Sequence, residues 1–127
     1  MATVLVVDDS KFIRLALTEA LKSFGHDVIA EAGDGAEGFT QYKTLHPDLV
    51  LLDITMPNRD GRACLQDILK ANPAAKVVMI SAIKEQSVVE FCLSEGAKGF
   101  IKKPLLFASD DYMRRFESTI SQALDGE

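Results

Sequence analysis

Residues 4–10 read VLVVDDS and residues 48–53 read DLVLLD, and these two stretches decide the fold. In each of them a run of four apolar residues ends directly in an acidic residue. Such a continuous apolar run is typical of a strand that is buried on both faces, as in a parallel sheet covered by helices. We therefore predict five strands, at residues 3–7, 28–31, 49–52, 77–80 and 99–102.

Between these runs the apolar residues recur at the spacing of an amphipathic helix. Ser10 is a favourable N-cap for the first helix, and Gly25 stands where that helix should stop. The predicted helices run from after Ser10 to 24, from after Asp34 to 45, over 62–71, over 84–95, and from after Ser109 to 124. Strands that alternate with helices predict an α/β fold, and right-handed crossovers favour a doubly wound parallel sheet.

Length and composition limit the classes of function. A chain of 127 residues is the size of one domain, and 47% hydrophobic with 26% charged residues is ordinary for a globular protein. The net charge of -5 disfavours direct binding to nucleic acid, and the apolar runs are too short to insert into a membrane. The N-terminus lacks the pattern of a signal peptide, so we expect a cytoplasmic protein. Cys64 and Cys92 match no zinc or redox spacing and are predicted to be packing residues.

Polar residues follow the predicted strands where each strand ends. Asp8 and Asp9 close the first strand, Asp53 closes the third, Ser81 follows the fourth, and Lys103 follows the fifth. Ligands of doubly wound sheets bind at this edge. Taken singly, each aspartate could simply cap a helix or begin a loop. Together, carboxylates suit Mg²⁺, a hydroxyl and an ammonium suit a transferred phosphoryl group, and a carboxylate can act as the nucleophile that forms an acyl phosphate.

Four stretches in this order resemble the receiver domain of bacterial response regulators, and especially its stand-alone chemotaxis type. They are residues 4–10 (VLVVDDS), 48–57 (DLVLLDITMP), 79–82 (MISA) and 96–104 (GAKGFIKKP). The resemblance covers about residues 2–125. It implies a flavodoxin-like, five-stranded parallel sheet of order 2-1-3-4-5 with five helices, and one receiver domain over residues 1–127.

The resemblance also implies roles for the acidic residues and their neighbours. Asp53 would be the phosphoacceptor, and Asp9 would bind Mg²⁺ directly. Asp8 would bind the ion mainly through water, and the backbone carbonyl of Thr55 would add a ligand. Lys103 would contact a phosphoryl oxygen, while Lys102 should point elsewhere because neighbours on a strand face opposite sides.

Two further residues would form the switch. Ser81 would donate a hydrogen bond to the phosphoryl group and change rotamer on activation, and Phe100 would swing inward when that hydroxyl moves. The same family pattern implies a cis peptide bond before Pro104.

Partner surfaces are expected on two helices. Phe12 and Leu15 lie off the core stripe of the first helix, and the resemblance implies that a sensor histidine kinase or phosphotransfer protein docks there. The resemblance also implies that a downstream protein target binds the face formed by the fourth helix, the fifth strand and the fifth helix. On this face the candidate contact residues are Val89, Leu93 and Phe100. Phe12 and Leu15 could instead be ordinary exposed apolar residues, and the apolar residues of the fourth helix could instead belong to a wide stripe that faces the core. The apolar link at residues 105–108 could pack on the core, extend the output surface or mediate self-association.

We therefore expect a single-domain response regulator of a two-component phosphorelay, possessing no enzymatic activity on an external substrate. It would accept a phosphoryl group from a histidine kinase on Asp53 and switch conformation to control a protein target in chemotaxis or motility. One alternative is a receiver excised from a larger DNA-binding regulator, because the end at residues 125–127 fits a terminus or a domain boundary equally well. Others are a degenerate receiver that only binds partners, and a Mg²⁺-dependent phosphate-ester enzyme, although Thr55 occupies the place where such an enzyme would need an acid.

Overall fold

Strands and helices alternate along the whole described chain. The computed structural model describes residues 1–83 and 85–125. The elements are β1 Thr3–Val7, α1 Lys11–Ser23, β2 Asp27–Ala32, α2 Gly35–Leu45, β3 Leu49–Asp53, α3 Gly61–Ala71, β4 Val77–Ser81, α4 Gln86–Glu95, β5 Gly99–Lys102 and α5 Asp110–Asp125.

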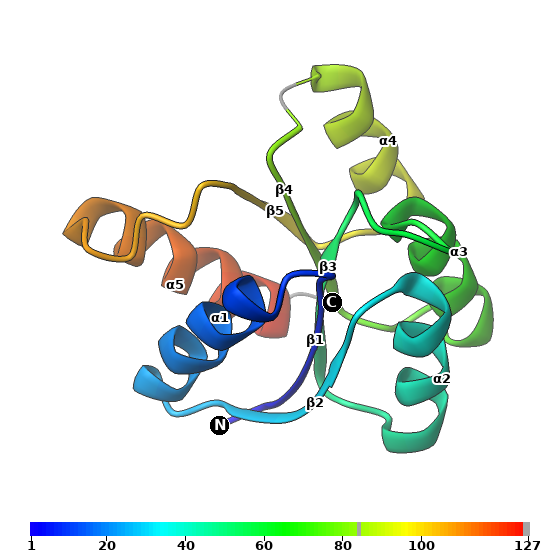
Figure 1. Cartoon of the computed structure of the whole chain (residues 1–127), viewed down its shortest axis with the longest axis horizontal. Helices are drawn as coiled ribbons and strands as arrows, with labels where there is room; N and C mark the ends of the chain where they lie inside the picture. The colour runs from blue at the N-terminus through cyan, green and yellow to red at the C-terminus, as the bar shows by residue number, and fades with distance from the viewer. Residues whose placement is uncertain (84, 126–127) are drawn as a thin grey trace.

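All four strand pairings are parallel, and the strands lie in the order β2-β1-β3-β4-β5. The predicted doubly wound sheet of order 2-1-3-4-5 is therefore confirmed. In Figure 1, α1 and α5 lie on one side of the sheet, and α2 and α3 lie on the other. The strand order reverses between β1 and β3, which is where a ligand site is expected in such a sheet.

The apolar runs fill two separate cores because successive side chains on a strand point to opposite faces. Leu5 and Val7 of β1 pack with buried residues of α2, α3 and α4. Val4 and Val6 pack with buried residues of α1 and α5 on the other face. This two-sided burial explains why β1 and β3 carry no alternation of apolar and polar residues.

Side-chain caps fix where most helices begin. Ser10 Oγ accepts a hydrogen bond from the Ile13 N–H, and the carboxylates of Asp34 and Asp60 cap α2 and α3 in the same way. The helix predicted over 62–71 begins one residue earlier, at Gly61. The fourth helix was predicted from Lys84, which lies outside the described residues, and α4 begins at Gln86. Residues 126 and 127 of the predicted domain also lie outside the described part.

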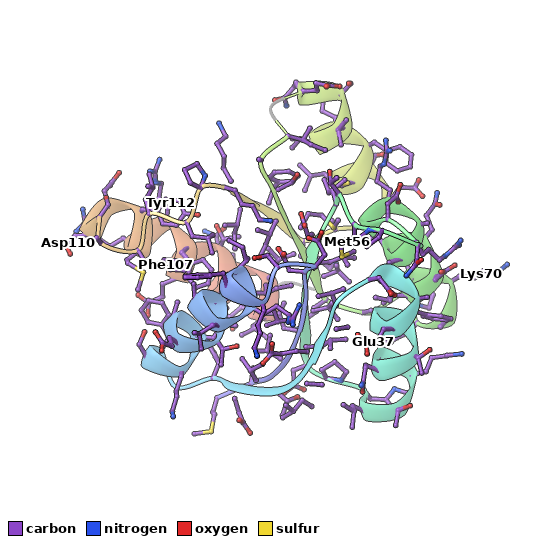
Figure 2. The ribbon with its side chains drawn as sticks, in the orientation of Figure 1. Glu37, Met56, Lys70, Phe107, Asp110 and Tyr112 are labelled. Atoms are coloured by element: carbon purple, nitrogen blue, oxygen red, sulfur yellow. The ribbon has the colours of Figure 1, made fainter. Side chains whose placement is uncertain are left out.

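The apolar link at residues 105–108 divides its side chains between core and surface. Leu105 and Phe107 pack against the core formed with α1 and α5. The Phe107 ring contacts the rings of Tyr112 and Phe116, at centroid distances of 5.6 and 5.0 Å. Figure 2 shows Phe107 and Tyr112 at the same end of α5. Leu106, by contrast, is 53% exposed.

Cys64 and Cys92 are both buried free thiols, as their positions on α3 and α4 predicted. Burial raises the pKa of the Cys64 thiol to about 12, so it stays protonated at neutral pH. Within residues 1–83 and 85–125, no helix has the length and apolar character needed to cross a bilayer.

Candidate functional site

Asp8, Asp9 and Asp53 come together where β1 and β3 end. The parallel register pairs Val7 with Leu52, so the residues that follow these two lie side by side. One carboxylate oxygen from each aspartate lies within 4.8 Å of one from each of the others. Asp8 is 1% exposed and Asp53 is 4% exposed, whereas Asp9 faces solvent. The sequence prediction that these acids share one edge of the sheet is confirmed.

Lys103 brings an ammonium group to the buried acids. Its Nζ lies 2.9 Å from Asp8 Oδ2 and 3.4 Å from Asp53 Oδ2. The Lys103 backbone N–H donates to the carbonyl of Ser81, which ties the end of β5 to the end of β4. The Lys103–Pro104 peptide bond is cis, as the family pattern implied. Lys102 is exposed, in keeping with the alternation along the strand.

Negative charge exceeds positive charge within this cluster. Burial raises the pKa of Asp53 to about 6, the charge of Asp8 adds to that rise, and Lys103 opposes it. Burial works to lower the pKa of Lys103, but its contact with Asp8 and the charge of Asp53 outweigh this effect, so the pKa is raised overall. Three carboxylates beside one ammonium form a site that a divalent cation would neutralise.

The donor set fits a hard cation such as Mg²⁺. Asp8 Oδ1 accepts a hydrogen bond from the Ser10 N–H, and Asp53 Oδ1 accepts one from the Ile54 N–H. Asp8 Oδ2 is fully buried, and among the described residues its charged neighbour is the Lys103 ammonium, which Asp53 also shares. Buried carboxylates are costly unless cations satisfy them, and one ammonium does not balance these acids. Oxygen-only ligands on carboxylates are what Mg²⁺ prefers.

Ser81 and Thr55 flank the acids on the neighbouring segments. Ser81 ends β4 and is buried, and its Oγ accepts a hydrogen bond from the Ile83 N–H. The register pairs Asp53 with Ile80 and Ser81 with Lys102, so Ser81 stands one step further along the same edge. Thr55 is exposed and lies two residues after the end of β3.

Phe100 lies on β5 and contacts both the core and a surface pocket. Its half-buried side chain packs against the core that includes α3 and α4 residues. It also lines a pocket of about 450 Å³ between β5 and α5, together with Leu106 and Tyr112. The Tyr112 hydroxyl donates to the Lys102 carbonyl at 2.6 Å and thereby fastens α5 to β5.

The predicted partner residues are exposed to different degrees. Phe12 is 85% and Leu15 is 57% exposed, so both lie on the solvent face of α1, the helix that follows Asp9 in the chain. On α4, Leu93 is 43% exposed and Val89 is half-buried. Both sets are therefore accessible at least in part.

Sequence reasoning missed the loops that hold the acids in place. A Cβ atom on Gly61 would lie 1.9 Å from the Asp53 carbonyl oxygen, and one on Gly35 would lie 2.1 Å from the Arg59 carbonyl oxygen. Only glycine allows these close backbone approaches. The signal was present, because each glycine directly follows the aspartate that caps its helix, at 34–35 and 60–61.

Comparison with known proteins agrees with this geometry. The family model described as "Response regulator receiver domain" matches residues 4–114. The chain is 46% identical to protein CcdB of Bacillus subtilis over 104 residues, which is 82% of this chain and 87% of that protein. It is 39% identical to the chemotaxis protein CheY of the same species over 118 residues, 93% of this chain and 97% of CheY. The crystal structure of the CheX-CheY-BeF3-Mg+2 complex from Borrelia burgdorferi contains a chain that matches with a TM-score of 0.85 at 42% identity, covering 93% of this chain and 88% of that one.

Proposed function

The chain belongs to the response regulator receiver domain family, and from that membership we propose that it is a phosphorylation switch whose phosphoacceptor is Asp53. The observation that carries the proposal is the nearly buried Asp53 carboxylate, which lies beside two further acids and the ammonium of Lys103. We also propose that the receiver domain takes in residues 1–127, since α5 continues beyond the matched residues to Asp125.

Asp9, Asp53 and the backbone carbonyl of Thr55 would hold Mg²⁺ directly, and Asp8 would hold it mainly through water. The Borrelia CheY was crystallised with Mg²⁺, which supports this choice of cation. When bound, the ion supplies positive charge that reduces the repulsion between a phosphodonor and the carboxylates. It would also favour the ionised form of Asp53, whose pKa burial raises.

The side chains divide the phosphoryl transfer between them. Asp53 Oδ1 is held by the Ile54 N–H, so Oδ2, which faces Lys103, is the nucleophile. Oδ2 attacks the phosphorus of a phosphohistidine in line. The new O–P bond forms as the P–N bond breaks, and the electron pair stays on the imidazole nitrogen, which takes up a proton. Lys103 stabilises the charge on a phosphoryl oxygen throughout.

Reversal of the switch uses the same site. A water molecule attacks the phosphorus of the acyl phosphate and loses a proton to solvent, the O–P bond to Asp53 breaks, and the carboxylate returns with its electron pair as inorganic phosphate leaves. This chemistry acts on the protein itself, so the chain is a signalling phosphoacceptor and not an enzyme with an external substrate.

The phosphoryl group shifts an equilibrium between two conformers because it binds one of them better. The Ser81 hydroxyl would turn from its contact with the Ile83 N–H toward the phosphoryl group. Phe100 would then move inward from the edge of the groove between β5 and α5. A signal at the strand edge would thereby change the face formed by α4, β5 and α5.

A histidine kinase or phosphotransfer protein would dock on Phe12 and Leu15, whose exposure on the helix that follows Asp9 supports this place. A downstream protein target would dock on Val89, Leu93 and Phe100. The CheX-CheY complex of Borrelia supports protein partners, and the CheY relatives support a role in chemotaxis. We propose that the protein acts in the cytoplasm without direct binding to nucleic acid or insertion into a membrane.

The test is to incubate the purified protein with Mg²⁺ and a small acyl phosphate donor and to measure its intact mass. We expect a gain of one phosphoryl group that requires Mg²⁺ and is lost in Asp53→Asn. Asp48→Asn is the matched control, because Asp48 precedes the same strand at its opposite end. A folded wild-type protein that gains no phosphoryl group would contradict the proposal.

A further inference from the structure

Residues 31–35, which comprise the end of β2, the loop after it and the first residue of α2, contact both of the segments that carry the acids. The Asp8 N–H donates to the Ala32 carbonyl at 3.0 Å, next to the end of β1. The Gly35 N–H donates to the Arg59 carbonyl at 2.8 Å, in the loop that follows β3. This segment offers no carboxylate to the cluster of Asp8, Asp9 and Asp53, yet it fixes the backbone on either side of it.

Arg14, on α1, connects this segment to the end of β1 through two hydrogen bonds. Its Nε donates to Glu31 Oε1 at 2.8 Å, and its Nη1 donates to the Asp8 carbonyl oxygen at 2.7 Å. The Arg14 side chain is mostly enclosed. A guanidinium is planar and holds its donors in a fixed fork, so it can bridge two acceptors with little freedom. Arg14 therefore ties the backbone of Asp8 to β2.

Asn58 makes the matching connection on the other loop. Its Nδ2 donates to Asp34 Oδ2 at 2.8 Å, while Asp34 Oδ1 caps α2 at the Glu37 N–H. Asn58 holds a left-handed backbone with φ of 64°. Asparagine adopts this conformation more readily than most residues. The loop that contains Thr55 is thus fastened to the start of α2.

We propose that residues 31–35 form a brace that sets the affinity for the divalent cation, and that Arg14 and Asn58 are the positioning residues through which it acts. The proposal rests on the function proposed above. Mg²⁺ requires near-ideal octahedral geometry, so small displacements of its ligands weaken binding. Groups that orient metal ligands commonly change metal affinity when they are removed.

The direction in which Mg²⁺ affinity changes when Arg14 is replaced distinguishes a positioning role from a purely electrostatic one. Arg14 is a cation near the acidic cluster, so removing it should tighten cation binding if only charge matters. If Arg14 acts by holding Asp8, its removal should weaken binding. A role in stability alone would lower the unfolding temperature and leave cation affinity unchanged.

The experiment is a calorimetric titration of the whole chain with Mg²⁺, beginning with the wild type. We expect Arg14→Gln to bind Mg²⁺ roughly tenfold more weakly. Arg14→Lys keeps the charge but cannot span both acceptors, so it should also be weakened. Arg115→Gln is the matched control, because Arg115 pairs with Asp111 on the exposed face of α5, and this variant should bind Mg²⁺ as the wild type does.

Asn58→Gly tests the connection between Asn58 and Asp34, and it does so even if the Arg14 variants do not fold. Glycine tolerates the positive φ, so this change removes the side-chain bond to Asp34 and leaves the backbone unstrained. We expect Mg²⁺ affinity to fall by up to about tenfold. The brace proposal is refuted if Arg14→Gln or Asn58→Gly binds Mg²⁺ as tightly as the wild type or more tightly. It is also refuted if Arg14→Lys binds with wild-type affinity.

The affinity of the wild type for Mg²⁺ is measured before any variant is compared. A wild type that does not bind Mg²⁺ refutes the proposed function itself.

Discussion

Replacing Asp53 by Asn should stabilise the metal-free protein, and the gain should depend on pH. Burial and the charge of Asp8 raise the pKa of Asp53 from 3.8 to about 6. The folded protein therefore holds the Asp53 proton more tightly than the unfolded chain does. Its stability falls as pH rises through the window from 3.8 to about 6, where the unfolded chain has already ionised.

The magnitude follows from the two pKa values. Each tenfold change in an equilibrium constant is about 1.4 kcal/mol, so ionised Asp53 lowers the free energy of unfolding by about 3 kcal/mol at about pH 7.5. At about pH 4.5 the same linkage gives only about 1 kcal/mol. Asparagine resembles the protonated carboxyl in shape and charge, so Asp53→Asn should recover these amounts.

The assay is urea denaturation in the presence of a chelator, at both pH values, for the wild type and Asp53→Asn. Asp48→Asn serves as a control of opposite sign, because hydrogen bonds from Thr3 lower the pKa of Asp48 and its replacement should destabilise. A stabilisation by Asp53→Asn that is equal at both pH values would refute the reasoning, since it could not come from ionisation. A loss of stability at about pH 7.5 would show that the contact with Lys103 outweighs burial.

Three further changes test the site and its supports. Gly61→Ala places a Cβ 1.9 Å from the Asp53 carbonyl oxygen and should lower the free energy of unfolding by about 1–3 kcal/mol or more, measured by urea denaturation. Retention of full stability would mean that the loop moves freely. Lys103→Gln removes the cation beside Asp53 and should slow phosphorylation by a small acyl phosphate roughly a hundredfold in saturating Mg²⁺, followed by intact mass over time. An unchanged rate would exclude Lys103 from the transfer. Tyr112→Phe deletes the donor to the Lys102 carbonyl and should cost about 1 kcal/mol in thermal or urea unfolding, whereas no change would show that the bond adds nothing.

The fold was predictable because local patterns determine most of it. Doubly buried strands must be continuously apolar, and the runs around Val4 and Leu49 have this property. The shared edge of Asp8, Asp53 and Lys103 followed from the same reasoning, since parallel strands end at one side of a sheet. Where a local signal was ambiguous, as at the start of the fourth helix, the predicted boundary was less reliable.

The supports of the site were not predictable in the same way. Arg14 and Glu31 are far apart in sequence and meet only because α1 packs across β2, so no spacing rule points to their pairing. Likewise, the pattern of the link at residues 105–108 gives no indication of which side chains face inward. That outcome depends on the aromatic contacts of Phe107 with α5, which only the assembled core defines.

The alternation of buried and exposed side chains in the link at residues 105–108 determines which substitutions the link can accept. Leu105 and Phe107 anchor the chain to the core, while Leu106 between them faces solvent. Folding should therefore tolerate few substitutions at positions 105 and 107 and almost any substitution at position 106. A library that randomises these three positions and is sorted for folded protein should recover charged residues at 106 and apolar residues at 105 and 107. Position 106 is therefore a suitable place to attach a label or a crosslinker.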